Sequence, residues 1–180
     1  MVGESPPLET EDGLAPQAPG WYVVNARQVR WVGQEGMWRG PWLEVEGAPW
    51  PALGFNVTVL DPGEPSGRYH GESNQEGFLV VAGECLLVVE GQERRLGQWD
   101  FFHSPPETEH IFVGAGDGPC VLLMAGARSE DEQIRYPVSE LAARYGASVA
   151  TETSEPDEAY ADYEPSRRER PSYWNQLPWA

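Results

Sequence analysis

Short apolar segments separated by turn signals fill the middle of the chain. Residues 55–60 alternate between apolar and polar side chains, as a half-buried strand does, and the sequence DPGEP that follows indicates a turn. Two continuous apolar runs, 77–82 and 85–90, lie on either side of a Gly-Glu turn and predict buried strands. Further short strands are expected at 68–72, 94–96, 99–104, 110–114 and 120–127. Strands this short at such regular spacing predict an all-β sandwich or barrel.

The two ends of the chain have a different character. Residues 1–20 are rich in Pro, Glu and Gly and predict a flexible or docked arm. The segment WYVV at 21–24 predicts the first strand, and the Trp- and Gly-rich stretch after it is expected to add an edge strand and a cover over one end of the barrel. Residues 137–145 predict a short helix with Pro in its first turn, and a second short helix is expected at 156–161.

These elements predict one domain with two extensions. A chain of 180 residues has room for one domain with a sizeable core. The expected division is an arm at 1–20, a β-barrel at 21–128, and a C-terminal helical and extended tail at 129–180.

The charge of the chain excludes several classes of function. The formal net charge is −17, which argues against nucleic acid and against an anionic membrane surface, because both attract basic proteins. All twelve basic residues are Arg and none is Lys. The lack of any amine side chain excludes Schiff-base chemistry, a lysine-anchored pyridoxal phosphate and a Walker-type phosphate loop.

The cysteines and the apolar runs bear on location. Cys85 and Cys120 each lie in an apolar segment and are interpreted as buried small residues in a reducing compartment, with a catalytic or disulfide role as the alternative. The first twenty residues lack the basic and apolar regions of a secretory signal, and no apolar run approaches the ~18 residues of a membrane span. We expect a cytoplasmic protein.

Candidate chemistry gathers around two of the three histidines. His70 and Glu72 are two residues apart in an expected strand, so their side chains project from the same face. Glu76 reaches that face if residues 73–75 form a bend. His110 follows a Pro-Pro turn forty residues after His70, and a barrel could bring it opposite the other three.

Two imidazoles and two carboxylates form a mixed nitrogen and oxygen set. Such a set suits one divalent ion, either Mn, Fe, Zn or Ni, and two carboxylates would neutralise its charge inside an apolar barrel. The alternative is a metal-free pocket in which these polar groups bond to one another. The role of Glu72 stays open between a metal ligand and an acid–base group beside the metal.

Two segments also resemble the motifs of a known family. Residues 67–83 (GRYHGESNQEGFLVVAG) resemble the first cupin motif, and residues 97–110 (GQWDFFHSPPETEH) resemble the second. The H-x-E-x(3)-E pattern in the first segment is similar to that of a little-characterised group of bacterial single-domain cupins. The resemblance implies a small double-stranded β-helix, or jelly-roll barrel, with one metal ion inside and dimers in solution. It carries over directly to His70, Glu76 and His110, and to Glu72 by position only.

The chain departs from those motifs at three positions. Glu72 replaces the second His of the first motif, which leaves the identity of the metal open. Glu107 replaces the glycine of the second motif and Gly114 stands where that motif has Asn, and both changes are expected to affect loop shape.

The side chains that line the pocket depend on which face of each strand points inward. The sequence leaves undecided whether Val80 and Met124 point inward. His103 is either a core or surface histidine or a proton carrier that lines the cavity. The candidates for pocket-lining residues are Tyr69, Gln75, Phe78, Trp99, Phe101 and His103.

Three functions are consistent with this pattern. The first is a mononuclear metalloenzyme acting on a small organic molecule, with dioxygenase chemistry as the guess that the cupin resemblance favours and isomerase or lyase chemistry from the same site. The second is a non-catalytic cupin that binds or senses a small ligand. The third is a purely structural barrel filled by aromatic side chains. A homodimer is expected, because a Trp-rich strand and an open barrel edge need cover.

Overall fold

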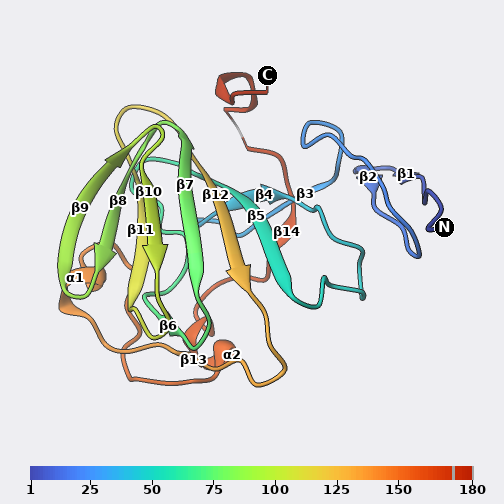
Figure 1. The fold of residues 1–180 in the computed structure, drawn as a ribbon. Coiled ribbons are helices and arrows are strands. Elements are labelled where there is room, and N and C mark those ends of the chain that lie inside the picture. The colour runs from blue at the N-terminus through green and yellow to red at the C-terminus, as the bar shows by residue number, and fades with distance from the viewer. Residues whose placement is uncertain (172, 180) are drawn as a thin grey trace.

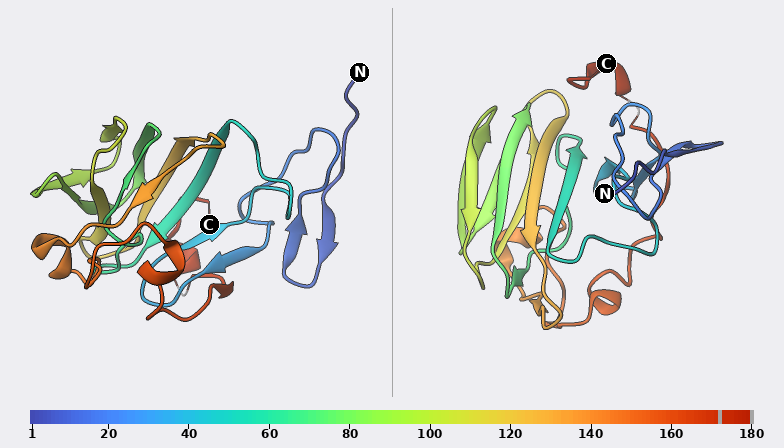
Figure 2. Two further views of the ribbon diagram at one scale, coloured as in Figure 1. Left: turned by 90° about the horizontal axis from the view of Figure 1, so that it is seen from below. Right: turned by 45° about the vertical axis from the view of Figure 1, so that its right-hand side comes forward.

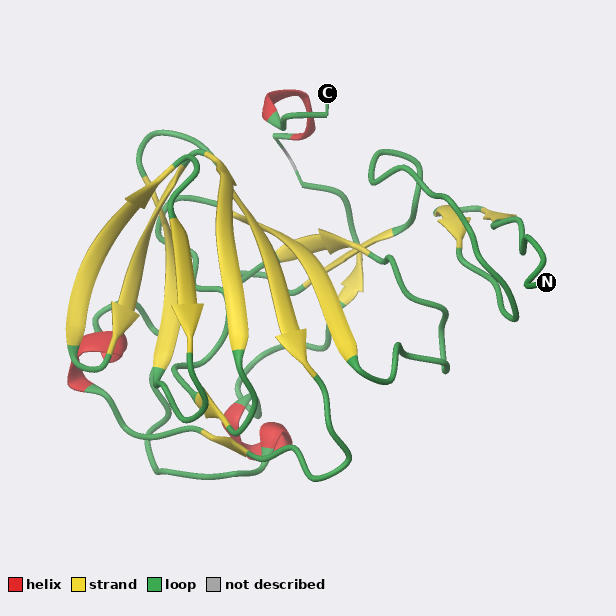
Figure 3. Ribbon diagram, viewed as in Figure 1, coloured by secondary structure: helices red, strands yellow, loops and turns green. Residues whose placement is uncertain are grey.

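The chain folds into two antiparallel sheets that face each other. The computed structural model describes residues 1–171 and 173–179. The strands of the larger sheet are, in spatial order, β10 (Phe101–Ser104), β7 (Glu76–Ala82), β12 (Cys120–Ala127), β5 (Leu53–Leu60), β4 (Arg39–Pro41), β3 (Trp31–Gly33) and β14 (Arg167–Arg168). The strands of the smaller sheet are, in order, β11 (His110–Ala115), β8 (Glu84–Val89) and β9 (Gln92–Gly97). Figure 1 and Figure 3 show these strands as a barrel that dominates the molecule.

Two small sheets and three helical turns complete the structure. A hairpin of β1 (Leu8–Thr10) and β2 (Gly13–Ala15) lies away from the barrel, as the right-hand view of Figure 2 shows. A second pair joins β6 (Gly71–Glu72) to β13 (Ile134–Arg135) at the lower end of the barrel in Figure 1. The helical turns are α1 (Glu140–Ala143), α2 (Pro156–Ala159) and the 3-10 turn η1 (Trp174–Gln176).

Alternate residues of the strands build the core between the sheets. Side chains two apart in a strand share a face, and on β12 the inward set begins with Cys120 and Leu122, both without exposed surface. In register with Leu122 lie Thr58 on β5 and Val80 on β7. The central hydrophobic cluster consists of Leu60, Phe78, Val80, Cys85, Leu87, Phe112, Cys120 and Leu122. Both cysteines are therefore free buried thiols, as predicted.

The strand predictions hold for the barrel and fail at the N-terminal end. The expected all-β class is confirmed, and the predicted strands at 77–82, 85–90 and 120–127 correspond to β7, β8 and β12. The strand predicted at 21–24 is wrong, because only an isolated bridge from Trp21 to Glu4 forms there. Trp21 and Val23 are exposed, so this apolar run has no sheet to pack against.

The C-terminal tail is fastened to the barrel beside the candidate site. Ser139 caps α1 by accepting a hydrogen bond from the amide of Ala142, so the helix begins later than predicted from Pro137. Arg68, just before β6, is buried and donates hydrogen bonds to the carbonyls of Ala159 (2.9 Å) and Gly146 (2.7 Å). These bonds fix both helical turns against the segment that carries His70.

The N-terminal arm contains structure that its composition did not predict. The hairpin of β1 and β2 is tied to the next segment by a hydrogen bond from the Leu14 amide to the Gln28 carbonyl at 2.8 Å. The division into arm, barrel and tail stays a prediction. No helix in the described part of the chain is long and apolar enough to cross a bilayer.

Candidate metal centre

The two histidines face each other across neighbouring backbone segments. The amide of His70 donates to the carbonyl of His110 at 3.2 Å, and the amide of His110 donates to the carbonyl of His70 at 2.8 Å. This is an antiparallel bridge, in which directly opposite side chains leave the same face. The ring centroids are 5.1 Å apart as a result.

Each histidine is oriented by a carbonyl two residues earlier. Nδ1 of His70 is 2.6 Å from the carbonyl oxygen of Arg68, and Nδ1 of His110 is 3.0 Å from that of Thr108. A carbonyl can only accept a hydrogen bond, so Nδ1 carries the proton in both rings. The Nε2 lone pairs are therefore free to bind a metal ion, in the arrangement that metal-binding histidines usually have.

Two carboxylates lie close to these free nitrogens. Nε2 of His110 is 3.5 Å from Oε2 of Glu76, and Nε2 of His70 is 3.5 Å from Oε1 of Glu72. His70, Glu76 and His110 can each offer a ligand atom such that all three atoms lie within 4.8 Å of one another. Glu72 lies beside this group without belonging to it.

Local structure places both carboxylates. Glu72 ends β6 and Glu76 begins β7, with a bend at residues 73–74 between them, as the sequence required. The bend is held by the loop before β13, because the Ser73 amide donates to the Gln133 carbonyl and the Gln133 amide donates to Oγ of Ser73, both at 2.9 Å.

Two departures from the motifs lie on either side of His110, one in the turn before it and one near the end of β11. Glu107 has φ of +67°, a conformation that favours glycine, and its amide donates to the Glu72 carbonyl at 2.7 Å. This bond ties the His110 turn to the strand that carries Glu72, at a cost of about 1 kcal/mol in backbone strain. Gly114 runs so close to Asp61 that a Cβ there would lie 2.1 Å from its carbonyl oxygen, so the asparagine of the motif could not fit.

Three aromatic rings pack against His110. The centroids of Phe78, Phe102 and Phe112 are 5.0, 5.6 and 6.0 Å from that of the His110 ring. The ring is 2% exposed, so little water reaches it. A metal ion bound here would be held at the boundary between this apolar wall and the open end of the barrel.

Burial and mutual charge move the pKa values of the two carboxyl groups apart. Burial and the nearby charge of Glu72 raise the pKa of Glu76 to about 7. Burial also opposes ionisation of Glu72, but the hydrogen bond from His70 and the charges of His70 and His110 lower its pKa below the ordinary value. One carboxyl group is thus held ionised while the other keeps its proton more readily.

The two histidines are shifted in opposite directions. Burial and the charge of His70 lower the pKa of His110 to about 4. Burial opposes protonation of His70 as well, but its bonds to Glu72 and to the Arg68 carbonyl raise its pKa above the ordinary value. At neutral pH His110 is therefore the neutral imidazole that a metal requires.

Of the six residues expected to line the pocket, only Phe78 lies against the histidine site. Tyr69 precedes His70 and points to the opposite face, where it packs with Val88 and Ile111. Gln75 is exposed.

The other three expected lining residues point outward. Trp99 and Phe101 are 67% and 65% exposed, and His103 is exposed. The register of β10 explains this, because Phe102 and Ser104 pair with Phe78 and Glu76, which point inward. The strand has the expected alternation, but its inward face is the opposite one.

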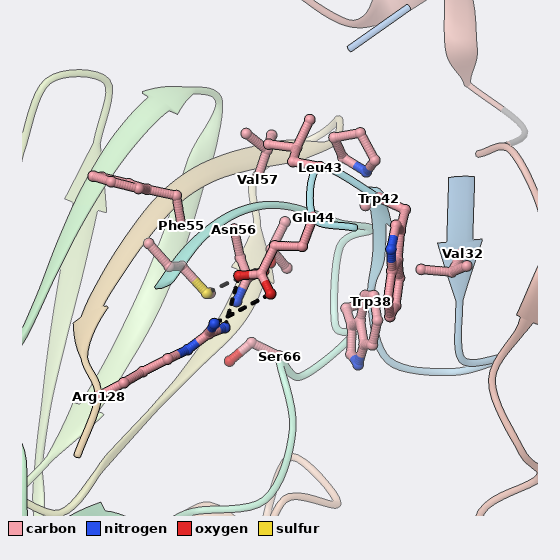
Figure 4. Close-up of a pocket in the computed structure, with 14 residues that line it drawn as sticks. Val32, Trp38, Trp42, Leu43, Glu44, Phe55, Asn56, Val57, Ser66 and Arg128 are labelled. Atoms are coloured by element: carbon pink, nitrogen blue, oxygen red, sulfur yellow. Dashed lines mark hydrogen bonds and ion pairs between the residues drawn. The ribbon is translucent and has the colours of Figure 1, made fainter. Parts of the chain in front are cut away.

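A hollow lies beside the histidine site, where it adjoins the two carboxylates. One part, of about 200 Å³, is lined by residues that include Glu72, Glu76, Met124, Arg128 and Glu132. A second part, of about 330 Å³, shares Asn56, Met124 and Arg128 with the first. Trp38 and Trp42 contribute to its far wall, and Glu44 lies beside Arg128 (Figure 4).

Sequence reasoning missed several of these lining residues. Arg128 follows Met124 and Gly126 at intervals of two on β12, so the alternation of that strand could have placed it. Glu132 lies in an irregular loop and Glu44 in the segment between β4 and β5. No periodic pattern in the sequence marks either of these two.

The donor set fits a divalent transition metal. Two imidazole nitrogens and one carboxylate on one side leave further positions open for a small molecule, as in mononuclear iron sites of the 2-His-1-carboxylate type. The approach of Nε2 of His110 to Glu76 and the fixed Nδ1 protons are the observations that favour a metal over a purely hydrogen-bonded pocket.

Comparison with known proteins agrees with this picture of the fold. Residues 56–126 match the model of the cupin domain family. None of the curated proteins compared matches the sequence.

Three solved structures show the same barrel. A sugar phosphate isomerase of the cupin superfamily from Silicibacter pomeroyi is 26% identical, with a TM-score of 0.50 over 55% of this chain and 66% of that one. KdgF from Halomonas sp. is 24% identical, with a TM-score of 0.50 over 63% and 98%. An RmlC-like cupin from Shewanella frigidimarina is 20% identical, with a TM-score of 0.50 over 60% and 91%.

These matches cover the barrel rather than the whole chain. The chain spans just under two thirds of the Silicibacter protein, and the family match lies within the barrel strands β5 to β12. The antiparallel jelly-roll barrel, the family match and the solved structures agree: residues 56–126 match the cupin domain family, and the chain has the cupin fold.

Proposed function

We propose that this cupin holds one divalent metal ion with His70, Glu76 and His110 and uses it on a small organic molecule. The observation that carries the proposal is the pair of Nδ1 hydrogen bonds to backbone carbonyls, which leave both Nε2 atoms directed toward carboxylates. When bound, the metal would supply Lewis acidity at the inner end of the hollow.

The reaction type that the site supports best is proton transfer, as in an isomerase or a lyase. Glu72 is held ionised beside the metal ligands and lines the same hollow, so it can take a proton from a bound molecule. The Glu107 amide donates to the Glu72 carbonyl at 2.7 Å and so fixes the backbone that carries this carboxylate. The likeness to a sugar phosphate isomerase from Silicibacter pomeroyi supports this reaction class.

A dioxygenase is the second candidate. Two histidines and one carboxylate form the set that mononuclear iron oxygenases use. A non-catalytic binding or sensing cupin is the alternative to both. Oxygen consumption separates the dioxygenase from the other two, and turnover separates the isomerase or lyase from the binding protein.

The metal assignment is tested by elemental analysis of untagged protein. We expect about one divalent ion per chain in the wild type and loss of that ion in His110→Ala. His103→Ala is the matched control, because His103 is an exposed histidine on the neighbouring strand β10. Equal metal content in all three proteins would refute the ligand role of His110.

The role of Glu72 is tested in the same way with one further measurement. Glu72→Gln should retain the ion and lose proton exchange between a bound sugar phosphate and deuterated water, followed by NMR. Retention of exchange would refute the acid–base role, and loss of the ion would make Glu72 a ligand instead.

Self-association stays a prediction. Trp99 and Phe101 expose apolar surface on the outside of the larger sheet, consistent with the expected homodimer. Light scattering after size exclusion tests it, and a monomer would contradict it.

A further inference from the structure

One basic side chain reaches into the hollow beside the histidine site. Arg128 follows the last residue of β12 and continues its inward-facing set after Met124 and Gly126. Among the described residues that line the two parts of the hollow, it is the one cation, and it borders both. In a chain with 29 acidic and 12 basic residues, a cation at this place is an informative exception.

Two glycines leave the space between Arg128 and Glu76 free of side chains. Gly126 on β12 lies directly opposite Gly54 on β5 and Glu76 on β7. We call such a row of opposite residues on neighbouring strands a rung, and this rung contains two glycines and Glu76. The neighbouring rung is filled, because Met124 pairs with Asn56 and Phe78. The hollow therefore opens at the rung that carries a proposed metal ligand.

Gly54 also permits the position of the guanidinium group. A Cβ at residue 54 would lie 2.8 Å from Nη2 and 2.9 Å from Nε of Arg128. The guanidinium thus lies against the backbone of β5, where any larger residue would displace it.

The partners of Arg128 hold it without using all of its donors. Nη1 donates to the Trp50 carbonyl at 2.9 Å. Nη1 also donates to Oε2 of Glu44 at 3.1 Å, and Nη2 is 2.8 Å from Oε1 of Glu44 (Figure 4). Within the part of the chain that the structure describes, Nε has no acceptor. Glu44 shows that a carboxylate fits this fork, whose planar geometry matches carboxylate and phosphate oxygens.

The rest of the wall suits the body of a small polar molecule. Asn56, Thr58 and Ser66 offer hydrogen bonds, and Trp38 and Trp42 offer flat apolar surface. Such mixed walls, with a few placed polar groups, are typical of small-molecule sites.

We infer that Arg128 is the specificity-determining residue of this site, which binds the acidic group, carboxylate or phosphate, of a small organic acid whose other end lies at the metal. The inference rests on the proposed function for the metal end, and on the position of Arg128 for the acid end.

The test compares three probes that share one ring: glucose, glucuronate and glucose 6-phosphate. Binding to manganese-loaded protein is measured by calorimetry. At least one of the two acids should bind about tenfold or more tightly than glucose, because a charge-assisted pair to Arg is added. The two acids share the sugar ring and carry a carboxylate or a phosphate at the same end of it, so their ranking tells carboxylate from phosphate.

Variants assign the preference to Arg128. Arg128→Gln should remove it, and Gly54→Ala should weaken it by displacing the guanidinium while leaving the strand intact. Arg94→Gln is the matched loss of charge, because Arg94 is exposed on β9. The inference is overturned if neither acid binds more tightly than glucose, or if Arg128→Gln keeps the preference.

Metal content separates this inference from the proposed function. If the protein holds one metal ion per chain but shows no acid preference that depends on Arg128, the role of Arg128 is refuted and the proposed metal site stands. If the protein holds no metal but prefers acids in a way that depends on Arg128, the proposed metal site is refuted and the role of Arg128 stands.

Discussion

The two ends of the barrel interior are built by the same strands and differ in almost every other respect. At one end, Leu60, Cys120 and Leu122 are fully buried and pack against one another. At the other end, β5 and β12 expose Asn56 and Arg128 to a hollow.

The change from one end to the other takes place over a few residues. On β12 the inward positions run from buried Cys120 and Leu122, through partly buried Met124, to Gly126 and Arg128. An apolar end supplies the free energy of folding, whereas polar groups gain little from burial and serve recognition. On β5 and β12, the residues that stabilise the fold and the residues that line the hollow therefore lie at opposite ends. We expect substitutions at one end to have a limited effect on the other.

The largest effect is expected from a substitution that opens a cavity at the apolar end. Leu122→Ala should cost about 2 to 5 kcal/mol in the free energy of unfolding, because Leu122 has no exposed surface and its neighbours cannot close the gap. Denaturant unfolding measures the loss. Metal content at a temperature where the variant is folded should equal that of the wild type, and a folded variant without metal would show that the two ends are coupled.

A matched pair of glycines compares the ends at smaller scale. Gly114→Ala, at the end of β11 away from His110, would place Cβ 2.1 Å from the Asp61 carbonyl oxygen and should cost about 1 to 3 kcal/mol. Gly126→Ala would place Cβ 3.8 Å from Cγ of Glu76, an ordinary contact, and should change the free energy of unfolding by less than about 0.5 kcal/mol. Thermal unfolding of both variants decides. Equal losses would remove the distinction between the ends.

The third comparison is the pH dependence of metal binding. The pKa of Glu76 is about 7 in the folded protein and that of His70 is raised, so protons compete with the metal for these groups. The proton on Glu76 alone should therefore lower the affinity for manganese by about tenfold per unit as the pH drops below about 7, and the proton on His70 adds to the fall. Calorimetry at pH 6 and pH 7.5 measures it. Affinity that does not change with pH would argue against Glu76 as a ligand.

The sign of the pH effect on folding is opposite for Glu76 and His110. Glu76 has a raised pKa, so its stabilising contribution to the metal-free protein is present below about 4.5 and is lost as the pH rises toward 7. His110 has a pKa of about 4, so its contribution is present above 6.5 and is lost as the pH falls toward 4.

The barrel strands and the main polar residues were predictable because each leaves a local pattern. The strand at 120–127 matches β12 at both ends, since eight apolar residues between turn signals have few other ways to be buried. His70 and Glu72 were placed on one face by a spacing of two. His110 could be added only through the motif resemblance, because no local rule joins residues forty apart.

The sequence by itself determined an all-β barrel, a mixed nitrogen and oxygen set of polar residues, and the lack of any Lys side chain. Only the tertiary structure decided which face of each strand points inward, and it turned Phe101 and His103 to the outside and Phe102 toward His110. The physical reason is that alternation fixes which residues share a face, whereas pairing with β7 fixes where that face points. The pairing of β5, β12 and β7 also places Gly54 and Gly126 opposite Glu76, which leaves a hollow there, and brings Arg128 to that hollow.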